Sequence, residues 1–121
     1  IRDVERSRGL GDVYKRQAVP GYSAFGFYTG NGSTTGPVIT TGFEPAWLLV
    51  KESSTAGGYW YVVDNKRNTS NPRNNELYPN TDGAQGSYSS FDFLSTGFQP
   101  VNAWSGTNAS SETYIYMAFA K

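Results

Sequence analysis

The apolar stretches of this chain are short and separated by turn residues, which constrains the fold more than any other feature. The clearest stretch is TYIYMAFA at residues 113–120. Its side chains form two alternating sets, and a period of two places these sets on opposite faces of a β-strand. No stretch shows the apolar spacing of an amphipathic helix. Short strands separated by turns predict an all-β sandwich or barrel.

The aromatic and β-branched residues that strands favour occur in six further stretches, at residues 22–28, 38–41, 46–51, 59–64, 75–78 and 90–94. Residues 46–51 (AWLLVK) are almost continuously apolar, which predicts a strand that is central or covered on both faces. We expect Trp47 and Trp60, which fall inside strands, to belong to the core. In residues 90–94 we expect Phe91 and Phe93 to point inward.

Two segments resemble each other, TGFEP at 41–45 and TGFQP at 96–100. We expect each to mark a reversal of the chain before a strand, with glycine at an unusual φ and proline at a sheet edge. Two copies do not establish a repeat architecture.

Residues 1–17 differ from the rest of the chain, because they hold five of its ten basic residues and follow no strand or helix period. Translated DNA of a transposase sequencing adapter accounts for them. GATGTGTATAAGAGACAG encodes DVYKRQ (12–17), and adjoining adapter sequence encodes SRGLG (7–11) and IRD (1–3). We therefore interpret residues 1–17 as an adapter-derived artefact forming a disordered tail, and residues 18–121 as one β-sandwich domain from a longer chain.

The amino-acid composition of the chain excludes several classes of function. The chain has no histidine and no cysteine, which excludes disulfides, the usual zinc sites and catalysis by Ser-His-Asp or Cys-His groups. The chain has ten basic and ten acidic residues, of which residues 1–17 hold five and three. Residues 18–121 therefore hold five basic and seven acidic residues. This body lacks the concentrated basic face that nucleic acid requires, and its apolar runs are far shorter than a membrane span. We expect no nucleic-acid partner, no membrane partner and no cofactor.

The acidic residues of the body lie in no recognisable catalytic motif, and we expect them to be solvated surface carboxylates. They are Glu44, Glu52, Asp64, Glu76, Asp82, Asp92 and Glu112. Asn80, Asp82 and Gln85 offer oxygen ligands of the kind calcium takes, but the spacing of a dedicated calcium loop is absent, so we interpret this segment as a turn and predict no metal site. For the basic pair Lys66–Arg67 we expect a solvated loop or a salt bridge.

Sugar binding needs an aromatic face next to amide or carboxylate groups. Trp104 lies in a polar segment (NAWSGTN), Tyr88 in another (GSYSS), and Tyr78 adjoins the loop that carries Asn80 and Asp82. These five residues are the candidate glycan contacts, because exposed loops carry most binding residues. The alternative, that such aromatics fill the core or cover the ends of a sandwich, stays open for Trp104.

The order of the motifs resembles a domain of unknown function that is common in bacteriophage tail-fibre and minor virion proteins. The matching segments are YTGNGS at 28–33, TGFEPAWLLVK at 41–51, DNKR at 64–67, LYPN at 77–80, FLSTGF at 93–98 and TYIYMAFA at 113–120. The resemblance covers residues 25–120 and implies a lectin-like, jelly-roll-like β-sandwich on a virion appendage. It implies no catalytic residues.

The residue patterns predict an antiparallel β-sandwich, and the resemblance implies a non-catalytic virion module that gives structure or receptor contact, with a host surface glycan as the candidate ligand. We expect other virion subunits as partners, with a homotrimer implied by the family setting alone. Two alternatives remain open. One is a carbohydrate-binding domain of an extracellular bacterial protein, and the other is a fragment of a polysaccharide depolymerase.

Overall fold

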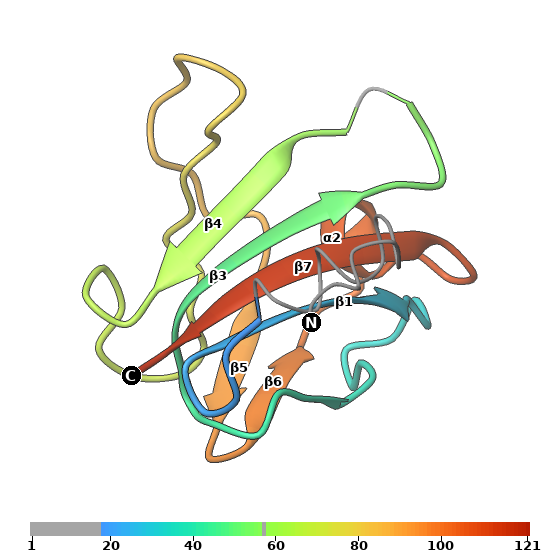
Figure 1. Ribbon diagram of the computed structural model, residues 1–121. Coiled ribbons are helices and arrows are strands. Elements are labelled where there is room, and N and C mark those ends of the chain that lie inside the picture. Colours follow the sequence, from blue (N-terminus) through green and yellow to red (C-terminus); the bar gives the residue numbers. More distant parts are fainter. Residues whose placement is uncertain (1–17, 57) are drawn as a thin grey trace, which may run out of the picture.

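Two antiparallel sheets pack face to face in the computed structural model, which describes residues 18–56 and 58–121 (Figure 1). The larger sheet has the strand order β1-β7-β3-β4 and the smaller one the order β2-β6-β5. The elements are β1 (Ser23–Thr29), β2 (Ile39–Thr40), β3 (Pro45–Glu52), β4 (Trp60–Asp64), β5 (Phe91–Leu94), β6 (Gly97–Pro100), helix α2 (Ser105–Asn108) and β7 (Thr113–Ala120). The chain passes repeatedly from one sheet to the other. The expected all-β sandwich is confirmed.

The side-chain alternation of β7 determines which face of the larger sheet is buried. Tyr114 and Ala118 are fully buried, whereas Ile115 and Phe119 lie on the opposite, exposed face. The expected alternation of 113–120 is therefore confirmed. β3 lies between β7 and β4, so its continuous apolar sequence belongs to a central strand, as predicted.

Aromatic rings from both sheets meet in the core. Phe98 of β6 is completely buried and packs edge-on against Tyr116 of β7 at 5.1 Å and against Tyr28 of β1 at 6.0 Å. Phe91 and Phe93 of β5 are also buried, which confirms the inward orientation predicted for them. Because large rings bury the most apolar area per residue, this cluster supplies much of the driving force for joining the sheets.

Trp47 and Trp60 are not core residues, and the expectation for both was wrong. Trp60 is 37% exposed and Trp47 is half-buried, and both lie on the outer face of the larger sheet. Cross-strand register explains this placement, because Trp47 is paired with Phe119 while their neighbours Leu48 and Ala118 point into the core. A run that is apolar on both faces does not reveal which face is covered.

Two other strand predictions differ from the structure. Residues 75–78 form only isolated bridges at Glu76 and Leu77. Residues 97–100, expected as part of a chain reversal, form strand β6 paired with β5. The tail expected at residues 1–17 lies outside the described residues.

The two TGF segments lie against each other. The amides of Thr41 and Gly42 both donate to the carbonyl of Thr96, at 2.9 and 3.1 Å. Gly42 has a φ of +86°, as its sequence context predicted. Gly97 is required for a different reason, since a Cβ there would lie 1.9 Å from the carbonyl oxygen of Ile39.

A stacked tyrosine pair closes one end of the core. The rings of Tyr28 and Tyr114 are 5.2 Å apart and nearly parallel. The Tyr28 hydroxyl donates to the carbonyl of Thr107 at 2.7 Å, and the Tyr114 hydroxyl donates to the carbonyl of Ser105 at 2.5 Å. The amide of Ala109 donates back to the Tyr114 hydroxyl. Both tyrosines therefore bind the segment that contains α2.

Burial raises the pKa of Tyr114 from 10.0 to about 12, and it also raises the pKa of Tyr28. The unfolded chain releases these protons near pH 10, whereas the folded protein retains them. The free energy of unfolding therefore falls as the pH rises from about 10 towards 12.

We expect Tyr114→Phe to make this fall shallower by about 1.4 kcal/mol per pH unit, because one retained proton is removed. Urea unfolding followed by circular dichroism across this pH range measures the slope. Tyr22→Phe, which removes a solvent-exposed hydroxyl, is the matched control. An identical slope in wild type and Tyr114→Phe would contradict the expectation.

Candidate functional site

Two of the predicted glycan-contact residues lie together on the surface. The rings of Tyr88 and Trp104 stack at a centroid distance of 5.5 Å and an angle of 25°. Tyr88 is 63% exposed and Trp104 is 38% exposed. These residues are 16 positions apart in sequence and form what we call the aromatic platform.

A hollow of about 380 Å³ adjoins the platform on the Trp104 side. Tyr59 and Tyr61 line it together with Trp104, and Glu52 and Ser105 contribute polar groups. Tyr59 is 47% exposed, whereas Tyr61 is buried. The surface thus joins ring faces to carboxylate and hydroxyl groups in one concave region.

Tyr78 is buried, and its assignment as an exposed contact was wrong. It is only 8% exposed and packs against Tyr59 at 5.4 Å and against Tyr61 at 5.9 Å. Its hydroxyl donates to Glu76 at 2.8 Å. Tyr78 therefore supports the rings that line the hollow from beneath.

Glu76 is also buried, contrary to the expectation that all acids of the body are solvated. Its exposed fraction is zero. The carboxylate accepts hydrogen bonds from the amides of Tyr88 and Ser89, at 3.0 and 2.9 Å, and from the hydroxyls of Tyr78 and Ser89. A buried carboxylate needs such partners, because an unpaired charge is costly to desolvate. Glu76 thereby fixes the backbone from which Tyr88 projects.

Asn102 connects the two halves of the platform. Its side-chain amide donates to the carbonyl of Tyr88 at 2.8 Å, and its oxygen accepts from the amide of Trp104 at 3.2 Å. Asn108, which is completely buried, donates to the carbonyl of Asn102 and also to that of Ser33. Hydrogen bonds within the protein therefore hold both residues of the platform in place.

The absence of a side chain at Gly106 leaves space for the close approach of Trp104 and Tyr61. A Cβ at this position would lie 2.4 Å from both the indole nitrogen and the tyrosine hydroxyl oxygen. Burial raises the pKa of Tyr61, and hydrogen bonding from Trp104 opposes this rise. The orientation of the indole thus depends on the absence of a side chain at 106.

Asn80 and Asp82 lie in an exposed loop, and among the described residues no hydrogen bond or ion pair joins them to Tyr88 or Trp104. The Asn80 oxygen accepts from the amide of Trp60 at 3.1 Å, so it joins this loop to the start of β4. Gln85 accepts from Arg67 at 2.8 Å, and no cluster of three or more acidic side chains is found in the described part of the chain. The amide of Thr81 donates to the carbonyl of Tyr78 at 3.1 Å, so a turn does form here, although the Asn80 side chain bonds β4 and not its own backbone.

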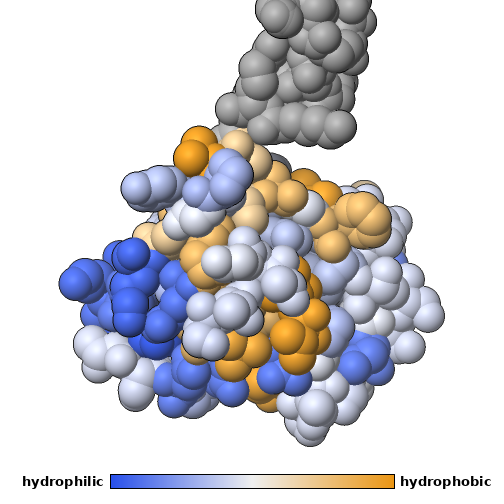
Figure 2. Space-filling model, turned by 60° about the horizontal axis from the view of Figure 1, so that its bottom comes forward, coloured by the Kyte–Doolittle hydropathy of each residue, from blue (hydrophilic) through white to orange (hydrophobic). Residues whose placement is uncertain are grey.

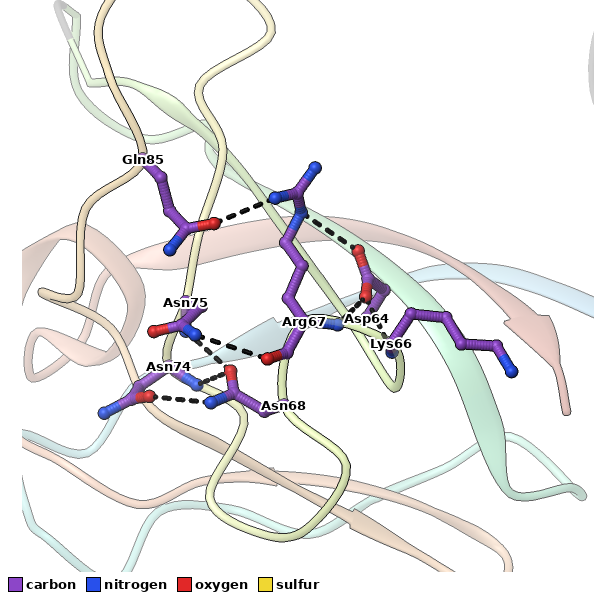
Figure 3. Close-up of polar contacts among 7 residues, drawn as sticks. All are labelled: Asp64, Lys66, Arg67, Asn68, Asn74, Asn75 and Gln85. Carbon is purple, nitrogen blue, oxygen red and sulfur yellow. Dashed lines mark hydrogen bonds and ion pairs between the residues drawn. The ribbon is translucent and has the colours of Figure 1, made fainter.

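The basic pair lies in a polar network after β4 (Figure 3). Asp64 accepts from the amides of Lys66 and Arg67 and forms an ion pair with the Arg67 side chain at 3.4 Å. Asn68 accepts from the amides of Asn74 and Asn75. In Figure 2 the most hydrophilic residues gather on the left, the side on which this loop lies in Figure 1. The expected salt bridge is confirmed.

The sequence profile of a domain of unknown function (DUF7483) matches residues 12–121, and the chain belongs to this family. The match includes residues 12–17, which the sequence interpretation had placed outside the domain. No curated protein and no solved structure matches the chain significantly. In the described residues, no helix is long and apolar enough to cross a membrane.

The sequence did not indicate the residues that hold the platform. Glu76, Asn102 and Asn108 are polar residues in polar segments, and such residues are exposed in most proteins. Their role depends on contacts with residues distant in sequence, such as Asn108 with Asn31 and Ser33. No local pattern carries that information.

We expect Glu76→Gln to lower the free energy of unfolding by about 1–3 kcal/mol, because the new amide group cannot accept all four hydrogen bonds. Chemical denaturation measures the change. Asp92→Asn makes the same chemical change at a half-exposed position and is the control. Equal stability of the two variants would show that the carboxylate does not hold this loop.

We expect Gly106→Ala to displace the Trp104 indole while leaving the sandwich folded. Heteronuclear NMR of the indole N–H resonances detects the displacement, with those of Trp47 and Trp60 unchanged. An unchanged Trp104 signal would contradict the close contact at residue 106.

Proposed function

We propose that this domain is a non-catalytic receptor-contact module that binds a surface glycan, in a phage virion protein of the tail-fibre type. The observation that supports glycan binding is the exposed Tyr88–Trp104 stack beside a hollow lined by Tyr59, Tyr61 and Glu52. The virion setting rests on the family resemblance of the ordered motifs.

Aromatic platforms suit sugars for a physical reason. One face of a pyranose ring carries C–H groups, which pack against an aromatic ring and exclude water from both surfaces. The hydroxyls at the rim of the sugar then need hydrogen-bond partners. Glu52, Ser105 and the hydroxyl of Tyr59 lie at the edge of the hollow and offer acceptors and donors.

The carboxylates support binding rather than hydrolysis. A glycosidase of the usual kind needs two carboxyl groups that flank the scissile bond. Among the described residues that line the hollow, Glu52 is the single acid. Glu76 is enclosed by four donors and fully buried, so it does not reach a ligand at the surface.

The platform is ordered before a ligand binds, which favours affinity. The Tyr88 and Trp104 backbones are joined through Asn102 before any ligand arrives. Binding therefore loses less conformational entropy than it would on free loops. A single shallow site of this kind binds weakly, and several copies on one particle raise the avidity without new contacts. A homotrimer or other virion subunits would supply those copies.

We expect Trp104→Ala to reduce glycan binding at least about tenfold, because stacking area and the wall of the hollow are lost together. A glycan array followed by titration calorimetry on the best hit measures the loss. Tyr22→Ala is the control, since Tyr22 is an aromatic residue that is 71% exposed and belongs neither to the platform nor to the hollow beside it. Equal binding by wild type and Trp104→Ala, or equal loss in both variants, would contradict the proposal.

Two further observations separate the alternatives. Release of reducing ends from a bound polysaccharide, abolished by Glu52→Gln, would indicate a depolymerase instead of a binding module. Glycan binding by a domain whose gene lies beside a bacterial adhesin or cellulase would favour the extracellular bacterial setting over the virion.

A further inference from the structure

We infer that the outer face of the larger sheet is an interface with a second copy of this chain. The face is formed by the outward side chains of β1, β7, β3 and β4, which lie side by side with β5 and β6 crossing behind them in Figure 1. We call it the outer apolar face. It is separate from the aromatic platform and does not depend on the proposed function.

Cross-strand register makes this face continuous. Phe25 of β1 is paired with Met117 of β7, which is paired in turn with Leu49 of β3. In the adjacent row Phe27 is paired with Ile115. The first row crosses β1, β7 and β3, and the second crosses β1 and β7. Residues from both rows line a hollow of about 620 Å³.

The face presents little charge. Lys51 is the basic residue in the second row, between Ile115 and Trp60. Its ammonium group donates to the carbonyl of Glu52 at 2.7 Å, at the end of the same strand. Its aliphatic stem is left to cover apolar surface. Asp64, opposite Trp47 on this face, is ion-paired with Arg67. Among the described residues of this face a charged macromolecule would therefore find isolated charges and no charged cluster.

The exposed area matches the requirement of a dimer. Phe27 is 71% exposed, and Phe25, Trp60, Ile115 and Phe119 are each 36–41% exposed. If a large side chain offers about 200 Å² when fully exposed, these five present roughly 450 Å². A standard interface takes about 800 Å² from each partner, of which roughly 57% is apolar, or about 450 Å².

A second copy fits this surface better than an unlike partner does. A two-fold interface brings one patch against itself, so the patch must be complementary to itself. A mostly apolar face, whose Lys51 ammonium is held at the end of β3, meets its own copy with little like-charge repulsion. Two sheets facing each other about 10 Å apart reproduce the packing already present inside the sandwich.

Light scattering coupled to gel filtration, on the full chain across a dilution series, tests the inference. We expect a mass of twice 13.3 kDa that falls to one chain on dilution. Phe27→Asp should raise the dimer dissociation constant by roughly 100-fold or more, because it places two carboxylates in a dry interface. Val38→Asp, at a position 61% exposed outside this face, should leave the constant unchanged.

Ile115→Asp is the second variant, in case Phe27→Asp does not fold by circular dichroism. A wild-type monomer at every concentration would overturn the inference. So would an oligomer that survives either substitution. A monomer that forms a complex only with an unlike virion subunit would assign the face to that partner.

Discussion

The stacked pair of Tyr28 and Tyr114 is the contact on which both the core and the candidate site depend. The two rings fill one end of the core between the sheets, while their hydroxyls hold the backbone at Thr107 and Ser105. A phenol suits this position because its ring gains from burial and its hydroxyl satisfies a carbonyl that would otherwise lack a partner. The segment that presents Trp104 is thus attached to the most buried part of the molecule.

Polar side chains extend this attachment to the surface. Asn108 joins the α2 segment to the loop at Asn31 and to the carbonyl of Asn102, and Asn102 joins Tyr88 to Trp104. Glu76 holds the other side of the Tyr88 segment. Asn108 and Glu76 are buried and each has several partners, so the removal of either leaves buried groups unpaired at a cost of about 1–3 kcal/mol. A surface supported in this way is suited to binding a ligand with little rearrangement.

The sequence predicted the class of fold because strand periodicity and turn residues are local properties. The alternation in β7 and the inward rings of β5 follow from a period of two, and the central position of β3 follows from its continuous apolar run. The exposed faces of Trp47 and Trp60 were not predictable, since nothing local shows that the outer face of this sheet is left uncovered by the other described elements. The candidate contacts Trp104 and Tyr88 were recognised from their polar surroundings, whereas the burial of Tyr78 and Glu76 depends on tertiary contacts.

The central claim is that buried tyrosines hold the loop that carries the platform. Amide hydrogen exchange of wild type and Tyr114→Phe, read at residues 105–109 and in β3, tests it most directly. We expect the amides of Asn108 and Ala109 to be strongly protected in wild type and to exchange far faster in the variant, while Leu48 and Val50 remain protected. Wild-type amides at 105–109 that exchange as fast as those of the exposed loop at 80–85 would contradict the claim.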